Sequence, residues 1–183
     1  MRMPIRVLLV AACVFAALPA AAEEKWEGEE LRVIRCTSGE TTVWKMEEEG
    51  FAEPGQFSGG TSLYWHDAAE VGAVLELALP VEKAGQYALS VGLARYRTFG
   101  RFQFLVNGKK AGDPVDMYGH PEVDAASPFT VPLGTFTLAA GANVLALRLV
   151  GTNPNTVMPN HGAGIDWIRL TPTPASPKPG KKE

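Results

Sequence analysis

The clearest structural signal in the sequence is the stretch Gln86-Tyr-Ala-Leu-Ser-Val-Gly-Leu-Ala94. Its large apolar side chains stand at every second position, and alanine, serine or glycine separates them. This period of two is typical of a β-strand that buries one face. Residues 101–106 alternate in the same way and lead into Asn107-Gly108, a dipeptide that favours a two-residue hairpin because both positions take a positive φ. The sequence therefore predicts antiparallel strands joined by tight turns.

The alternating pattern extends over most of the chain, and no segment shows the 3.6-residue stripe of an amphipathic helix. Turn-forming residues are abundant, with 19 glycines and 14 prolines among 183 residues. We therefore expect an all-β fold, an antiparallel β-sandwich of about nine strands. The expected strands are residues 31–36, 42–46, 62–66, 74–81, 86–94, 101–106, 129–138, 143–150 and 164–170.

The charge of the chain argues against one class of partner. Residues 23–171 contain 12 Lys and Arg against 19 Asp and Glu, a net charge of −7. Nucleic-acid binding requires a basic surface, because most of the affinity comes from contacts with phosphates. We therefore expect no nucleic-acid partner.

The first 22 residues have the pattern of a secretory signal peptide. Basic residues precede an apolar run over residues 7–18, and three alanines at 20–22 precede Glu23. The apolar run is too short to cross a bilayer, which needs roughly 20 residues. We expect cleavage after Ala22 and export to the periplasm or the extracellular space. The alternative is a lipoprotein anchored through Cys13, but the apolar run continues past that cysteine.

The expected domain organisation is one folded unit and a tail. Residues 172–183 are rich in proline and lysine and contain no large apolar residue, so they are expected to form a disordered, solvated tail. The β-sandwich is expected to span residues 23–171. Only Cys36 remains in that unit, which excludes an internal disulfide.

The order of several short motifs resembles a known family. Glu27-Gly-Glu29 opens the unit, Ser58-Gly-Gly60 precedes Leu63-Tyr-Trp65, the hairpin at residues 106–109 follows, and Gly164-Ile-Asp-Trp-Ile-Arg-Leu170 closes it. This series resembles galactose-binding-like jelly-roll modules, including carbohydrate-binding modules of families six and thirty-five. It is also similar to the accessory C-terminal module of some bacterial double-jelly-roll glycoside hydrolases. The resemblance covers nearly all of residues 25–171 and implies a jelly roll that binds carbohydrate.

The resemblance also implies a structural calcium ion. In families six and thirty-five an opening Glu-x-Glu and a closing Asp commonly help to bind one, and the matching residues are Glu27, Glu29 and Asp166. Calcium takes six to eight oxygen ligands, so one ion could join the first and last strands. The alternative is that these three acids lie on a solvated surface.

The candidate sugar-binding residues lie in loops expected at the end of the sandwich. Proteins bind sugars with aromatic faces and with polar side chains that bind the hydroxyls. Exposed Tyr96 and Phe99 around a groove would favour a sugar site, whereas burial of both would mean that they cover the sandwich end. The candidates are Arg95, Tyr96, Arg97 and Phe99 in one loop, and Asn153, Asn155, Asn160 and His161 in another.

The sequence contains no established catalytic motif, and its three histidines lack zinc-type spacing. Asp113, Asp116, Glu122 and Asp124 could supply the two carboxylates of a glycoside hydrolase, although a charged loop is the simpler interpretation. We therefore expect a non-catalytic, exported module that binds a polysaccharide or a surface glycan. The main alternative is a structural or protein-interaction β-sandwich without a sugar site, and a glycoside hydrolase is the less favoured one.

Overall fold

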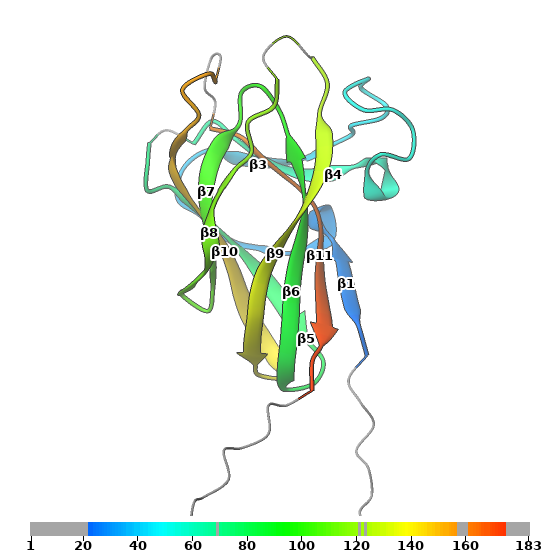
Figure 1. Cartoon of the computed structure of the whole chain (residues 1–183), viewed down its shortest axis with the longest axis vertical. Coiled ribbons are helices and arrows are strands. Elements are labelled where there is room, and N and C mark those ends of the chain that lie inside the picture. The colour runs from blue at the N-terminus through cyan, green and yellow to red at the C-terminus, as the bar shows by residue number, and fades with distance from the viewer. Residues whose placement is uncertain (1–21, 69, 121, 123, 157–160, 175–183) are drawn as a thin grey trace, which may run out of the picture.

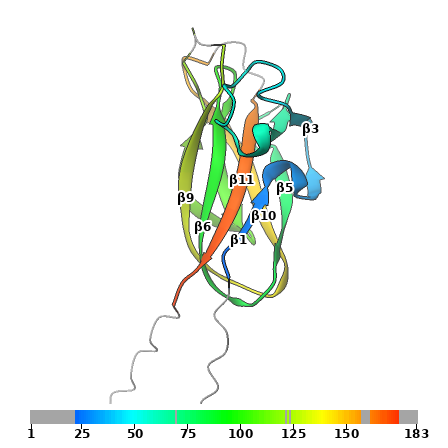
Figure 2. The same ribbon diagram turned by 90° about the vertical axis from the view of Figure 1, so that its right-hand side faces the viewer.

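A computed structural model describes residues 22–68, 70–120, 122, 124–156 and 161–174. Two antiparallel sheets pack face to face in these residues (Figures 1 and 2). The sandwich confirms the expected all-β fold. The elements are β1 (Glu24–Glu27), η1 (Gly28–Glu30), β2 (Val33–Cys36), β3 (Glu40–Trp44), η2 (Ser58–Gly60), β4 (Ser62–His66), β5 (Val74–Val81), β6 (Gly85–Arg95), β7 (Gly100–Val106), β8 (Lys109–Asp116), β9 (Ser127–Leu138), β10 (Gly141–Thr152) and β11 (Ala163–Pro172), where η denotes a 3-10 turn.

The first sheet has the order β3-β4-β11-β6-β9, and the second has the order β2-β5-β10-β7-β8. Strand β1 pairs with β11 beside the segment of β11 that pairs with β4. The first and last strands are therefore neighbours, and the chain enters and leaves at one end of the sandwich (Figure 1). The loops after β3, β6, β8 and β10 gather at the opposite end, called the loop end below (Figures 1 and 2).

The core lies between the two sheets, where the alternating residues meet. Tyr87, Leu89, Val91 and Leu93 of β6 are all buried, as the alternation predicts. Their partners on the second sheet include Phe102 and Phe104 of β7 and the three alternating leucines of β10. Full burial of one such side chain stabilises the fold by about 1.5–3 kcal/mol relative to exposure.

The described chain contains eleven strands instead of about nine, because β1 and β8 were not expected. Part of β8 was assigned to a loop, since its sequence, Lys109 to Asp116, does not alternate. Its pairing with β7 is irregular between Phe102 and Phe104. The Gln103 side-chain amide secures this irregularity by donating to the carbonyls of Ala111 and Gly112. A side-chain clamp of this kind leaves no periodic signal in the sequence.

The ends of the expected domain fall partly outside the described residues. The signal peptide, including Cys13, lies almost wholly there, as do residues 175–183 of the expected tail. Strand β11 continues to Pro172, and the Thr173 backbone N–H donates to the Gln86 carbonyl at 2.8 Å, so the folded unit reaches slightly beyond residue 171. Across the described ranges, no helix has the length and apolar character needed to span a membrane.

Candidate functional site

The outer face of the first sheet carries a cluster of aromatic side chains at the loop end. Residues opposite one another in neighbouring antiparallel strands point to the same face. Thr42 lies opposite Tyr64, Tyr64 opposite Gly164, and Gly164 opposite Ala94. These residues therefore line the face that points away from the core residues Leu63 and Leu93.

Two loops fold over this face. The turn between β6 and β7 brings Tyr96 and Phe99 onto it, and the segment after β3 brings Phe51. The Phe99 ring stacks on Tyr64 with centroids 5.7 Å apart, and the Tyr96 ring meets Trp44 edge-on at 5.5 Å. The five rings form a small second core outside the sandwich.

This packing corrects the expectation for Phe99. Its side chain has no exposed surface, so it cannot stack on a sugar as the sequence suggested. Tyr96 is also buried, with 9% of its surface exposed. Both residues cover the end of the sandwich, which was the alternative to a sugar contact.

A pocket of about 320 Å³ nevertheless opens beside the cluster. Its size lies near the lower end of the range for ligand sites, about 300–1,000 Å³. Aromatic rings dominate the lining, and the polar groups come from one threonine, one glutamate and the tyrosine hydroxyls. The lining residues are Thr42, Val43, Trp44, Glu49, Phe51, Tyr64 and Tyr96.

The polar groups of the 95–99 segment are held by the protein itself. The Tyr96 hydroxyl donates to the Asp124 carboxylate, which also lies 3.1 Å from Arg97 Nη2. Burial, and then the hydrogen bond and charge of Asp124, raise the pKa of Tyr96 to about 12. Arg95 is exposed and lies over the Phe129 ring at 4.3 Å. Of these residues, the structure places only Tyr96 on the pocket.

The described candidates of the second loop, Asn153, Asn155 and His161, do not line the aromatic pocket. Asn153 donates its amide to Asp116 at 2.8 Å, and His161 Nδ1 lies 2.7 Å from the Ala68 carbonyl. Asn155 is exposed. Asn160 lies outside the described residues.

The 95–99 segment and the turn after β8 contain buried polar atoms that have no hydrogen-bond partner. They are Arg97 Nε, Thr98 Oγ1 and the Tyr118 hydroxyl, and the backbones of Tyr96 and Tyr118 form a bridge that brings the two loops together. Unsatisfied buried polar groups are rare in native proteins, because each costs about 1–3 kcal/mol. A ligand or ordered water would satisfy these three atoms.

Two of the four acids that could form a glycosidase pair, Asp116 and Asp124, make structural contacts. Asp116 accepts from the Tyr118 backbone N–H at 3.1 Å and from Asn153, which fixes the turn after β8. Asp124 is bonded to Tyr96 and Arg97. Asp113 and Glu122 are exposed.

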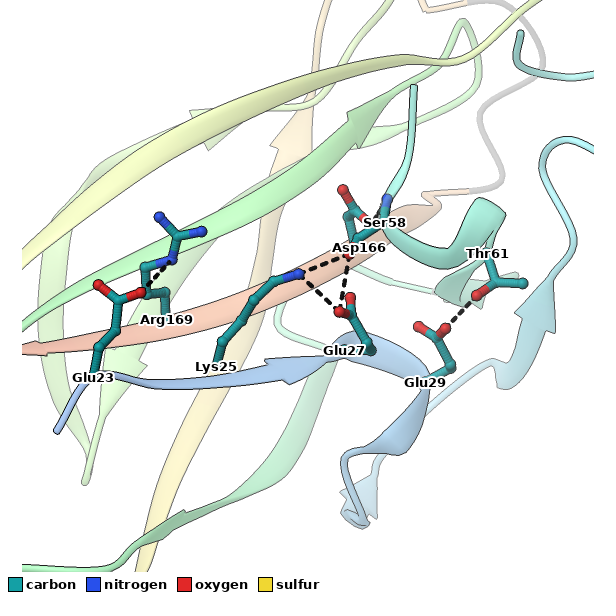
Figure 3. A network of polar contacts seen from close by, with 8 residues as sticks. All are labelled: Glu23, Lys25, Glu27, Glu29, Ser58, Thr61, Asp166 and Arg169. Atoms are coloured by element: carbon teal, nitrogen blue, oxygen red, sulfur yellow. Dashed lines mark hydrogen bonds and ion pairs between the residues drawn. The ribbon is translucent and has the colours of Figure 1, made fainter. Parts of the chain in front are cut away.

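A separate network joins the first and last strands where β1 meets β11 (Figure 3). Asp166 lies at a bulge of β11, between the part that pairs with β4 and the part that pairs with β1. Its carboxylate accepts the Ser58 backbone N–H at 2.9 Å. Glu27 Oε1 accepts from the Lys25 ammonium at 2.7 Å and from the Ser58 hydroxyl at 2.9 Å. Glu29 accepts a hydrogen bond from Thr61.

The structure brings the three expected calcium ligands into one region: Glu27 and Asp166 both bind Ser58, whereas Glu29 binds Thr61 separately. Asp166 is 3% exposed, and burial, opposed by its hydrogen bond and reinforced by the charge of Glu27, raises its pKa to about 6. The second oxygens of Glu27 and Glu29 are buried and have no partner. These features fit a bound cation, since carboxylate oxygens are the ligands that calcium prefers. As arranged, however, no three acidic, histidine or cysteine side chains of the described residues converge into a ready metal site.

The main residues of the pocket were not predicted from the sequence. Trp44 and Tyr64 fall within the expected strands 42–46 and 62–66, and no role was expected for Glu49 or Phe51. The alternation in Leu63-Tyr-Trp65 does place Tyr64 on the outer face. The sequence carries no comparable signal that the loops fold back over it.

No protein-family model matches the sequence, and no curated protein is a detectable relative. Solved structures do share the fold. A xanthan lyase from Paenibacillus matches with a TM-score of 0.68 at 19% identity, over 86% of this chain and 14% of that chain. A β-(1,4)-mannanase from Podospora anserina with a family 35 module matches with a TM-score of 0.52 at 19% identity, over 86% of this chain and 29% of that chain. A family 35 carbohydrate binding module from Clostridium thermocellum matches with a TM-score of 0.51 at 15% identity, over 84% of this chain and 100% of the module.

This chain therefore spans only a small part of the first two matched chains but all of the third. At 15–19% identity, the likeness shows the fold alone. The shared fold is a β-sandwich like that of the family 35 carbohydrate binding module, as the order of motifs in the sequence implied.

Proposed function

We propose that the protein is a non-catalytic module that binds carbohydrate in the pocket beside Trp44 and Tyr64. The observation that carries this proposal is an aromatic-lined pocket of about 320 Å³ at the loop end of the sandwich. Sugar rings present C–H patches that pack on aromatic faces, while their hydroxyls require hydrogen-bonding groups. The module from Clostridium thermocellum, which has the same fold over its full length, is named as a carbohydrate binding module.

In this proposal the aromatic side chains and the polar groups have different roles. Tyr64, which is half-buried, presents the apolar face, and Trp44, which is only 6% exposed, packs beside it with ring centroids 4.9 Å apart and planes inclined by 31°. Thr42, on the edge strand β3, and Glu49, in the turn that follows β3, bind the hydroxyl groups of the sugar. Phe99 supports the wall from beneath and does not touch the ligand.

The test is binding of the full chain to a glycan array and to insoluble polysaccharides. We expect selective binding that the Tyr64→Ala substitution weakens by about tenfold or more, since a lost stacking contact of about 1.4 kcal/mol corresponds to a factor of ten. Phe136→Ala is the matched control, because Phe136 is also a partly buried aromatic residue but lies on β9 outside the pocket. Equal losses in both variants, or no binding by folded protein, would overturn the proposal.

A protein-interaction scaffold is the second candidate function, and the burial of Tyr96 and Phe99 favours it. It predicts no sugar selectivity on the array and no effect of Tyr64→Ala there. Release of sugar from any polysaccharide that the protein binds would instead indicate a glycoside hydrolase. That activity should then disappear in Asp116→Asn or Asp124→Asn.

We also propose a structural calcium ion that Glu27, Glu29 and Asp166 would hold. The two unpartnered glutamate oxygens and the raised pKa of Asp166 support it. Binding would require the Lys25 ammonium to leave Glu27, because that contact now supplies the positive charge. Elemental analysis of protein purified without chelator tests the site, and a calcium content near zero after calcium dialysis would exclude it.

Export is the proposed cellular context, on the evidence of the N-terminal sequence. The intact mass of protein secreted by a bacterial host tests it. A mature chain that begins at Glu23 would agree with the proposed cleavage after Ala22. A lipid-modified chain that begins at Cys13 would establish the lipoprotein alternative, and an uncleaved chain would contradict both.

A further inference from the structure

We infer that the aromatic pocket selects an uncharged pyranose residue and rejects uronates, and that Glu49 is the residue that sets this selectivity. The inference rests on the proposed function and specifies its ligand class. Among the described residues, Glu49 contributes the one carboxylate of the lining, and no lysine or arginine is part of it.

The backbone of the turn after β3 holds Glu49 at this position. The Glu49 N–H donates to the Lys45 carbonyl at 2.9 Å, and the Phe51 N–H donates to the Met46 carbonyl at 2.8 Å. Met46 is completely buried and anchors the turn, and Gly50 takes the positive φ of 77° that reverses the chain. The position of Glu49 is therefore set without a hydrogen bond to its side chain.

Lys45 and Arg97, two cations of the surrounding loops, are paired with other acids, and Arg95 lies over the Phe129 ring. Lys45 binds Glu48 at 2.8 Å, and Arg97 binds Asp124 at 3.1 Å. Glu47, beside Glu48 in the sequence, accepts the Gly55 backbone N–H at 2.7 Å. Glu49 is exposed, and within the described chain its carboxylate has no hydrogen bond or ion pair, although the Lys45 ammonium attracts it at longer range. Its carboxylate is thus available to a ligand.

This arrangement distinguishes ligands by charge. Neighbouring hydroxyls of a neutral sugar can donate to a carboxylate, and such charge-assisted hydrogen bonds are about twice as strong as neutral ones. A uronate would place a second negative charge beside Glu49, and like charges brought together in this way weaken binding strongly. The pocket offers no cation to offset that repulsion.

The test compares pairs of sugars that differ only at C6. Titration calorimetry of the full chain with the methyl glycosides of glucose and glucuronate, and of galactose and galacturonate, measures the preference directly. We expect the neutral member of the pair that binds to be preferred by about tenfold or more. Glu49→Gln should reduce that preference to within about threefold, and added salt should reduce it in the wild type.

Glu53→Gln is the matched control, because it removes the same charge from the same exposed segment without touching the pocket. It should leave the preference unchanged. Tighter binding of the uronates, with a loss in Tyr64→Ala, would overturn the selectivity inference while carbohydrate binding stands. An unchanged preference in Glu49→Gln would also overturn it. Absence of binding by all four sugars and by the glycan array would instead contradict the proposed function.

Discussion

The Phe99 ring packs directly on Gly164 at the centre of the outer face of the first sheet. A Cβ atom placed on Gly164 would lie 3.4 Å from Phe99 Cε2 and 2.8 Å from the Ala94 Cβ. The absence of a side chain at Gly164 therefore lets the 96–99 turn settle onto the sheet. Through Phe99, strand β11 supports the wall of the proposed sugar pocket.

Phe99→Ala is expected to destabilise the fold by about 3–5 kcal/mol, the usual cost of deleting a buried phenylalanine. Urea denaturation followed by tryptophan fluorescence measures the change in the free energy of unfolding. Arg95→Ala is the control from the same segment. Arg95 is exposed and contacts only the Phe129 ring in the described structure, so its loss should cost about 1 kcal/mol or less. A change below 1 kcal/mol in Phe99→Ala would show that the second core contributes little.

Most of the sandwich could be predicted from the sequence because burial between two sheets imposes a period of two. Tyr87 to Leu93 show that pattern in full, and all four large residues are buried. Strand β8 could not be predicted, since it lies at a sheet edge and is held to β7 partly by the Gln103 amide. Trp167 stands two residues after the core residue Ile165, but the bulge at Asp166 turns it to the outer face over Gly92.

The candidate site was harder to predict because it depends on long-range packing. Asp166, Glu27 and Glu29 were found through the family resemblance, and the structure joins Asp166 and Glu27 through Ser58 but leaves Glu29 bound to Thr61 alone. Phe99 and Tyr96 have suitable chemistry for sugar binding, yet the loop end lies over a sheet face lined by Gly164 and Ala94 and buries them. Local sequence specifies the residue types in a loop, but not the surface onto which the loop folds.

Tyr96 is expected to ionise with a pKa of about 12, because its hydroxyl is buried and donates to Asp124. An ultraviolet titration of phenolate should therefore show a component near pH 12, which Tyr96→Phe removes and Asp124→Asn moves toward the ordinary value of about 10. Burial also raises the pKa of Tyr87, so that late-ionising tyrosine should remain in both variants. Because the pKa of Tyr96 is raised in the folded state, the corresponding stability is present below about pH 10 and is lost as the pH rises toward 12. Ionisation of all four tyrosines near pH 10 in folded protein would contradict this contact.

Asp166→Asn should have opposite effects on stability with and without calcium. In chelator, the raised pKa of about 6 means that the charged carboxylate destabilises the fold above pH 6. That destabilisation disappears as the pH falls toward 4, because the folded state then takes up the proton more readily than the unfolded chain. At pH 8 the variant should gain up to about 3 kcal/mol, since each pKa unit corresponds to 1.36 kcal/mol.

In calcium, the wild type should gain thermal stability and Asp166→Asn should gain little, because a carboxylate ligand has been removed. Melting curves at pH 5 and pH 8 in chelator and in calcium measure both effects. Glu30→Gln is the control, since Glu30 is an exposed acid of the same 3-10 turn. A wild-type melting temperature that does not respond to calcium would contradict the calcium proposal but not the predicted pH dependence.

Gly28→Ala is expected to disrupt the junction between the first and last strands. A Cβ at this position would lie 2.0 Å from the Ile165 carbonyl oxygen, a backbone atom that cannot rotate away. The turn η1 would have to move off β11, which would displace Glu27 on one side and Glu29 on the other. We expect the free energy of unfolding to fall by about 2 kcal/mol or more, in the range of severe overpacking, together with loss of any calcium response.

Gly55→Ala is the control that separates this clash from backbone strain. Gly55 has a φ of 81° and open space around its Cβ position, so the substitution should cost only about 1–2 kcal/mol. If Gly28→Ala keeps wild-type stability and its calcium response, the close approach of η1 to β11 does not position the two glutamates.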